Sequence, residues 1–137
     1  MEKSNSSFIK KERVYYEYTD AGGIVYHSNY LNFMERCRCD WLDQIGYSVK
    51  IIQQKFGLMF VVSSADVQFH APAHLFDELD VTCDVLHVGK VKLIVEQKIY
   101  NKEQLLCSAT IKLATLDETS YKLRGMPDEL RNKLLGH

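Results

Sequence analysis

The longest pattern of apolar positions in the chain has the period of a helix. Between about residues 29 and 45, apolar side chains recur every three or four positions, which places them on one face of an α-helix. The members of this stripe are Tyr30, Met34, Cys37, Trp41 and Ile45. Further apolar residues beside the stripe predict a helix that is buried over much of its surface. A second, short helix is predicted from about residue 48 to residue 55.

The second half of the chain changes to the period of a strand. Apolar residues at every second position predict strands at residues 60–70, 79–88, 91–100 and 105–116. In the first of these strands the alternation predicts one shared face, made of Val61, Ser63, Ala65, Val67 and Phe69. A run of β-formers predicts a fifth strand at residues 13–18. A last short helix is predicted to begin at Pro127.

Together these elements predict an α+β fold, an antiparallel β-sheet wrapped around one long central α-helix. Amphipathic strands leave an apolar face that needs a cover, and the helix at residues 29–45 is the only predicted element long enough to supply it. We predict a single domain over residues 13–137. The polar segment before it, residues 1–12, is predicted to be flexible.

Composition restricts the classes of function. The chain has 137 residues and a formal net charge of -1, so it lacks the broad basic field that recruits nucleic acid. No stretch approaches the roughly 18 apolar residues of a membrane span, and no apolar secretion signal is recognisable at the N-terminus. The four cysteines form no CxxC pair and show no metal-ligand spacing. We therefore predict reduced thiols in a cytoplasmic protein and no metal site.

The candidate chemistry lies in TDAGGIVYHSNY, residues 19–30, where a carboxylate and a glycine turn precede the long helix. A helix N-terminus presents unpaired N–H groups that can stabilise the oxyanion of acyl transfer. Asp20 beside it could attack a carbonyl carbon or activate a water molecule. From the residues alone, a structural role is the simpler interpretation. In that case Asp20 stabilises the turn, and His27 or Ser28 caps the helix.

Two longer motifs carry a family resemblance. The segment VYYEYTDAGGIVYHSNYLNFMERCR, residues 14–38, closely resembles the signature of the YbgC-type acyl-CoA thioesterases, which are related to 4-hydroxybenzoyl-CoA thioesterase. The segment FVVSSADVQFHAPAHLFDEL, residues 60–79, is similar to the second strand of that family and its following turn. One departure is Tyr18, at a position where many relatives carry an acid. The resemblance implies a hotdog fold that forms dimers, usually paired into tetramers, with active sites at the subunit interface.

The resemblance also implies roles for residues of the first motif. Asp20 is expected to be the catalytic carboxylate, acting as nucleophile or general base. His27 is expected to bind the thioester carbonyl through its backbone N–H, with no metal or redox cofactor. Tyr26, Asn29 and Tyr30 are expected to shape the mouth of the pocket.

Other residues are candidates for substrate binding. Val62 and Ser63 lie on the strand near the expected pocket, although Ser63 is equally interpreted as a satisfied core serine. Lys90, with Lys92 beside it, is a candidate for the phosphates of coenzyme A; otherwise both are solvated lysines. Glu35 is a reserve catalytic acid, with pairing to Arg36 or Arg38 as its alternative.

The leading functional prediction is hydrolysis of an acyl-CoA thioester to a free acid and coenzyme A. A dehydratase acting on hydroxyacyl carrier protein ranks below it, because the acid precedes the helix in the thioesterase arrangement. The alternative from another class is a binding protein with weak thioesterase activity. It would be associated with acyl carrier protein or with the Tol–Pal cell-envelope system, to which YbgC-type proteins are linked.

Overall fold

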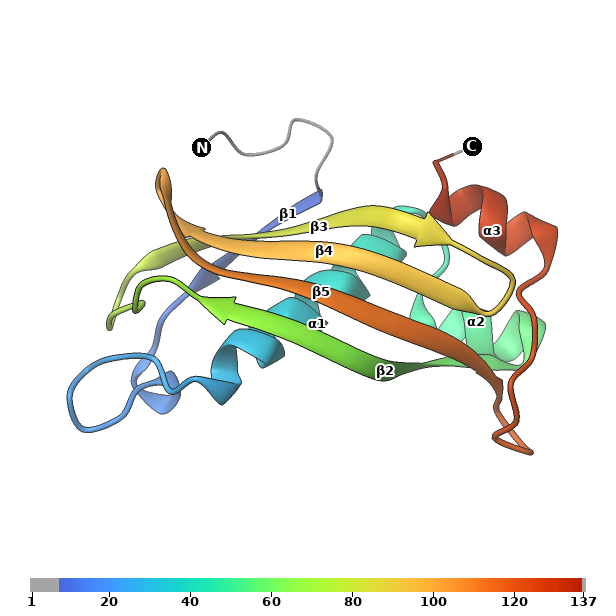
Figure 1. Cartoon of the computed structure of the whole chain (residues 1–137), viewed down its shortest axis with the longest axis horizontal. Helices are drawn as coiled ribbons and strands as arrows, with labels where there is room; N and C mark the ends of the chain where they lie inside the picture. The colour runs from blue at the N-terminus through green and yellow to red at the C-terminus, as the bar shows by residue number, and fades with distance from the viewer. Residues whose placement is uncertain (1–7, 137) are drawn as a thin grey trace.

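The computed structural model of the chain describes residues 8–136, which form a five-stranded antiparallel sheet with helices against it (Figure 1). The strands are β1 (Phe8–Arg13), β2 (Leu58–Phe69), β3 (Glu78–Val88), β4 (Lys92–Asn101) and β5 (Gln104–Asp117). The helices are α1 (Ser28–Gln44), α2 (Val49–Phe56) and α3 (Asp128–Leu134), with a single 3-10 turn at Tyr16–Tyr18. The predicted helices and the four later strands are confirmed, with ends that differ by one or two residues.

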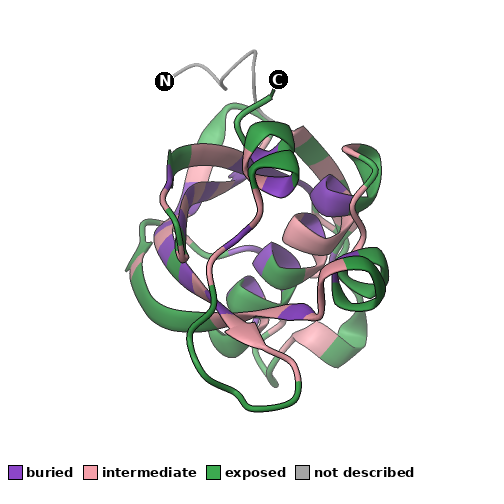
Figure 2. Ribbon diagram, turned by 90° about the vertical axis from the view of Figure 1, so that its right-hand side faces the viewer, coloured by how far each residue is buried: buried purple, intermediate pink, exposed green. Residues whose placement is uncertain are grey.

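The sheet has the order β1-β3-β4-β5-β2, with every neighbouring pair antiparallel. It curves around α1, and the buried residues of helix and sheet face one another across the interior (Figure 2). The predicted α+β arrangement of a hotdog fold is therefore confirmed. Within residues 8–136, no helix is long and apolar enough to cross a membrane.

The helix α1 is buried along the predicted stripe. Its buried residues are Tyr30, Phe33, Met34, Cys37, Trp41 and Leu42. It packs mainly against β1 and β3, at one side of the sheet, while α2 packs against β2. Between α2 and the start of α1, the inner face of β2 is consequently left open. All four cysteines are free thiols, and burial raises the pKa of Cys37 and of Cys107 to about 12.

The prediction for the first strand was wrong. The strand is Phe8–Arg13, and Tyr16–Tyr18 form a 3-10 turn instead. Residues 8–12, predicted to be flexible, thus belong to the sheet, while residues 1–7 of that prediction lie outside the described residues. The strand lacks apolar alternation because charged side chains take the inward positions: Lys10 pairs with Asp40 of α1, and Glu12 pairs with Arg36.

The predicted face of β2 was also wrong for its first half. A β-bulge between Val62 and Ser64 inserts one residue, so the alternation shifts there. Residues opposite the buried positions of β5 share its inner face, and in β2 these are Phe60, Val62, Ala65, Val67 and Phe69. Val61 and Ser63 therefore do not continue the face of Ala65.

The two edges of the sheet differ in chemistry. Four of the six residues of β1 are charged, whereas the twelve residues of β2 include a single charge, Asp66. Charged, short edges resist pairing with another chain, and long edges with few charges favour it. The edge at β2 is thus the one suited to pairing.

Candidate functional site

The loop that carries Asp20 is a tight turn held by its own carboxylate. The Gly22 N–H donates to Asp20 Oδ1 at 2.8 Å, and the Gly23 N–H donates to the Asp20 carbonyl at 3.1 Å. Gly23 has a φ of 76°, a conformation that a residue with a side chain rarely adopts. Asp20 therefore does stabilise the turn, as the structural interpretation predicted. The described residues donate to Oδ1 and not to Oδ2, and Asp20 as a whole is exposed.

The loop is fixed to the start of α1 through Tyr18. The Tyr18 carbonyl accepts from the Tyr26 N–H at 2.8 Å and from Asn29 Nδ2 at 3.0 Å. A β-bridge between Thr19 and Val25 closes the loop above these bonds. The side chain of Asn29 thus connects the Asp20 loop to the helix, and its predicted place at the pocket mouth stays a prediction.

At the helix start the cap differs from the structural interpretation. His27 occupies the N-cap position, and its side chain makes no capping hydrogen bond. The N–H groups of Asn29 and Tyr30 donate to the carbonyls of Tyr26 and His27. The His27 N–H has no acceptor among the described residues, so it remains free to donate to a substrate oxygen. Such a free donor at a helix N-terminus is the arrangement that oxyanion stabilisation requires.

The two tyrosines of this segment take different places. Tyr26 is half exposed, and its ring lies 4.5 Å from the His27 ring; its place at the pocket mouth stays a prediction. Tyr30 is buried, with 3% of its surface exposed, so in this chain it lies beneath the surface at the helix start. Its hydroxyl accepts the Ala73 N–H at 2.9 Å, and burial raises the pKa of its phenol. Through this hydrogen bond, the Tyr30 side chain connects α1 to the turn that follows β2.

Replacing Tyr30 with Phe is expected to lower the free energy of unfolding by about 1–3 kcal/mol, because the buried Ala73 N–H loses its acceptor. Chemical denaturation measures this loss. Tyr26→Phe is the matched control, since the Tyr26 side chain is exposed and should change stability by less than about 0.5 kcal/mol. Equal stability of the two variants would show that the Tyr30 hydroxyl does not support the turn.

A groove between α1 and β2 leads away from the helix start. Two adjoining cavities of about 510 Å³ and 200 Å³ lie along it, and both are lined by Glu35, Arg38 and Val62. The end of the groove nearest the helix start is lined by Leu31 and Asn32, one turn into α1. Phe69, at the end of β2, lies beside the helix start, with its ring 5.5 Å from Tyr30 and 6.5 Å from His27. Val62 lines the groove, and its contact with substrate stays a prediction.

Two other candidates occupy different surroundings from those predicted. Ser63 sits in the bulge, where its Oγ donates to the Lys112 carbonyl at 3.1 Å, so it is not a hydroxyl of the inner face. Glu35 lies seven residues into α1, about 10 Å from the helix start, and does not join Asp20. The predicted pairing of Glu35 with Arg36 is also wrong, because Arg36 Nε binds Glu12 at 3.1 Å.

Lys90 lies at the other end of the sheet from Asp20. The Asp20 loop contacts the segment before β3, whereas Lys90 follows β3, so the eleven residues of that strand, about 35 Å, separate them (Figure 1). Lys90 lines a basic cavity of about 460 Å³ together with Lys55 and Arg124. A single subunit thus does not bring Lys90 to its own Asp20.

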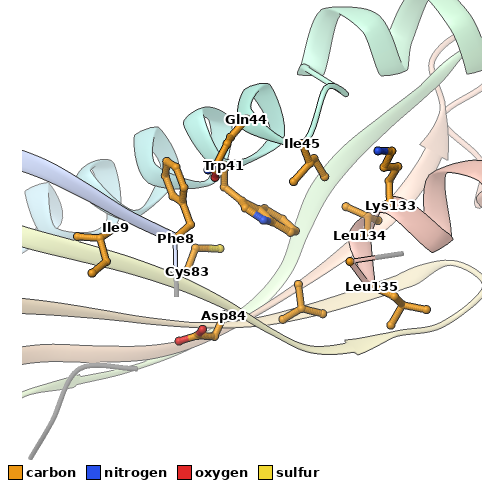
Figure 3. Close-up of a pocket in the computed structure, with 12 residues that line it drawn as sticks. Phe8, Ile9, Trp41, Gln44, Ile45, Cys83, Asp84, Lys133, Leu134 and Leu135 are labelled. Atoms are coloured by element: carbon orange, nitrogen blue, oxygen red, sulfur yellow. The ribbon is translucent and has the colours of Figure 1, made fainter. Parts of the chain in front are cut away.

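A further cavity, of about 600 Å³, lies between the end of α1, β1, β3 and α3 (Figure 3). Trp41, Cys83 and Leu134 line it, about 20 Å along α1 from the helix start. It contains neither of the predicted catalytic residues. Among the described residues no three potential ligands are grouped as a metal site would require.

Comparison with known proteins gives a consistent result. A family model described as the thioesterase-like superfamily matches residues 14–134. The acyl-CoA thioesterase YbgC of Haemophilus influenzae is 35% identical over 127 residues, which is 93% of each chain. The acyl-CoA thioester hydrolase YbgC of Escherichia coli O6:H1 is 35% identical over 119 residues, 86% of this chain and 88% of that one.

Solved structures agree in fold. A probable thioesterase from Bartonella henselae superposes with a TM-score of 0.84 at 28% identity, covering 89% of this chain and 100% of that one. A 1,4-dihydroxy-2-naphthoyl-CoA thioesterase from Synechocystis gives a TM-score of 0.86 at 22% identity, covering 96% and 97% of the two chains. The second likeness supports the fold alone.

Proposed function

The chain belongs to the thioesterase-like superfamily, and from this we propose that it hydrolyses acyl-CoA thioesters at the site formed by Asp20 and the start of α1. The observation that carries the proposal is the pairing of a carboxylate oxygen free of described partners with the free N–H of His27, on two segments tied at Tyr18. Release of free thiol from a panel of acyl-CoA esters, graded by length and aromaticity, tests it. Absence of thiol release from every ester would contradict the proposal.

The chemistry follows from this pairing. The thioester carbonyl oxygen accepts the His27 N–H, which stabilises the negative charge that develops there. Asp20 either attacks the carbonyl carbon, expelling coenzyme A as thiolate and leaving an anhydride that water cleaves, or removes a proton from the water that attacks. Both routes yield a free acid and coenzyme A. Neither route needs a cofactor, because a thioester is already activated.

We further propose that two copies pair through β2. The edge of β2 is open and carries a single charge, and its inner face leaves Val62 and Phe69 half exposed. Pairing of one strand with its own copy about a two-fold axis is antiparallel, so it places the end of β2 beside the start of β2 in the partner. The helix start and Asp20 of one subunit then lie near the Lys90 end of the other.

This pairing gives Lys90 a role in trans. Its cavity with Lys55 and Arg124 suits the phosphates of a coenzyme A whose thioester lies at Asp20 of the other subunit. Replacing Lys90 with Ala is expected to raise KM for acyl-CoA roughly two- to fivefold with little change in kcat, since an exposed ion pair contributes little. Steady-state kinetics measures the change, and Lys133→Ala at the far cavity serves as the control. An unchanged KM would contradict the role.

A mixed dimer separates a role in trans from a role in the same subunit. A hybrid of Asp20→Asn and Lys90→Ala subunits contains one site with an intact Asp20 in the Lys90→Ala subunit. If Lys90 acts in trans, this site has the normal KM, because the other subunit supplies the lysine. If Lys90 acts within its own subunit, the hybrid shows the raised KM.

The binding-protein alternative stays a prediction. Capture of partners by wild type and by Asp20→Asn would show whether any association depends on the site. The free cysteines favour a reducing compartment, so we propose the cytoplasm as the location.

A further inference from the structure

Arg38 is a half-buried cation of α1 in the groove that leads from the site. It lines both cavities of that groove. Of the five N–H donors of its guanidinium, described residues engage one, since Nη1 donates to Gln97 Oε1 at 2.9 Å. No carboxylate of residues 8–136 forms an ion pair with it, and Glu35, one turn earlier, acts on it only at longer range. Arginines placed in this way usually meet a carboxylate or phosphate.

Gln97 holds the guanidinium in place. It is fully buried in the central strand β4, and its Nε2 donates to the carbonyls of Met34 at 3.0 Å and of Thr82 at 3.3 Å. These two bonds fix the orientation of the amide, so that Oε1 must face Arg38. A site whose supporting residues are locked in this way is organised before a ligand arrives.

The surroundings leave the charge of Arg38 uncompensated. Burial lowers the pKa of its guanidinium, and the nearby acid Glu35 offsets this effect only in part. A half-buried charge without a partner is costly, and an incoming anion or polar oxygen would relieve the cost. Arg36, two residues earlier, differs because its Nε donates to the Glu12 carboxylate at 3.1 Å, so that its charge has an ionic partner, although its buried Nη2 has no acceptor among the described residues.

The position along α1 indicates what reaches Arg38. It lies ten residues after Ser28, about 15 Å along the helix axis, and side chains of a helix lean toward its N-terminus. An acyl group whose carbonyl is held at the His27 N–H, and whose chain runs along α1, would enter the groove at Leu31 and pass Val62 on its way to the guanidinium. Its near part would then contact apolar side chains, and its far end would meet a cation.

We propose that Arg38 is a specificity-determining residue that binds an oxygen acceptor at the far end of the acyl group, foremost a carboxylate. The inference rests on the proposed thioesterase function and names its substrate class: medium-length acyl groups with a polar terminus. An unsubstituted acyl chain of equal length would leave the guanidinium without a partner.

The test compares matched esters on one enzyme preparation. The pairs are suberyl- with octanoyl-CoA, sebacyl- with decanoyl-CoA, and dodecanedioyl- with dodecanoyl-CoA, and the readout is kcat/KM for thiol release. Wild type should prefer the ω-carboxyl member of at least one pair. Arg38→Met should reduce that preference by about 10- to 100-fold, the range for a charge-assisted hydrogen bond. The ratio within a pair does not depend on the fraction of folded enzyme, so a destabilised variant still gives an answer.

Two further variants sharpen the result. Arg36→Met should leave every ratio unchanged, whereas Arg38→Lys should retain part of the preference because it keeps the charge but not the planar fork. Equal kcat/KM within every pair for wild type, or equal ratios in wild type and Arg38→Met, would overturn the inference while leaving the thioesterase function intact. Weaker self-association of Arg38→Met, with unchanged ratios, would also overturn the inference. It would show that the Arg38 guanidinium contacts the other subunit rather than the acyl group.

Failure of the thioesterase function is distinguishable. If wild type releases thiol from none of the esters, the role of Arg38 in binding is tested instead by the dissociation constants of the same paired esters. Tighter binding of the ω-carboxyl member, lost in Arg38→Met, would support the binding role, and equal dissociation constants would overturn it.

Discussion

Replacing Asp20 with Asn is expected to lower kcat by roughly 10²- to 10⁴-fold, the usual contribution of a side chain that acts as base. The amide oxygen of Asn can still accept the Gly22 N–H, so the turn and the free energy of unfolding should be preserved. What the variant lacks is the carboxylate charge that we propose acts on the thioester. Thiol-release kinetics with the best ester of the panel measures the loss.

Asp43→Asn is the matched control for this variant, because it removes an exposed carboxylate from the other end of α1. It should retain full activity. Binding of the ester to Asp20→Asn, measured by calorimetry, should be close to that of wild type, which would separate a defect in chemistry from a defect in binding. Wild-type turnover by Asp20→Asn would remove Asp20 from the mechanism.

Replacing Phe33 with Ala is expected to lower the free energy of unfolding by about 3–5 kcal/mol, the cost of emptying a buried aromatic position. Phe33 has no exposed surface, and its ring packs edge-on against Tyr18 at 5.0 Å and against Tyr30 at 6.5 Å. The Arg36 guanidinium covers it at 5.2 Å. Phe33 therefore contacts Tyr18, Tyr30 and Arg36 at once.

We expect the Phe33→Ala substitution to lower catalytic activity as well as stability. Tyr18 supplies the carbonyl that ties the Asp20 loop to Tyr26 and Asn29, and without Phe33 its ring loses its packing partner. We therefore expect kcat to fall even at temperatures where the variant is folded. Denaturant titration gives the stability, with Ile51→Ala on the exposed side of α2 as a control that should change it far less. A loss of less than 1 kcal/mol, roughly the cost of an ordinary substitution, would contradict this account of the core.

The long elements could be predicted from the sequence because apolar periodicity alone determines them. The stripe from Tyr30 to Trp41 is buried as expected, and β4 and β5 have the alternation of half-buried strands. In β3 the expected polar face is buried as well, because the five consecutive residues Leu79–Cys83 are all buried. The strand β1 was missed because its inward residues are charged and find partners on α1, which no local pattern reveals. A bulge has no apolar signature either, so the inner face of β2 was predicted one residue out of phase before Ser64.

The catalytic role of the site stays a prediction. Residue types alone favoured a turn-stabilising role for Asp20, and the family motif indicated catalysis. The free N–H of His27 is compatible with that role. Contacts between distant segments could not be predicted, among them Tyr30 with Ala73 and Arg38 with Gln97. A polar residue in the middle of an apolar strand, as Gln97 is in β4, was the signal that could have indicated the second contact.

The two edges of the sheet differ in charge, and this difference affects how many subunits can add to one another through strand pairing. A contact through β2 that did not close on itself would leave one β2 edge free and would add further chains without limit. A closed two-fold pair hides both β2 edges and presents only the two charged edges of β1, whose four charged residues discourage further strand addition. In such a pair, one edge suited to pairing and one charged edge would make growth of the sheet self-limiting. An isolated subunit would leave its β2 edge unpaired, so it would be the form most exposed to aggregation.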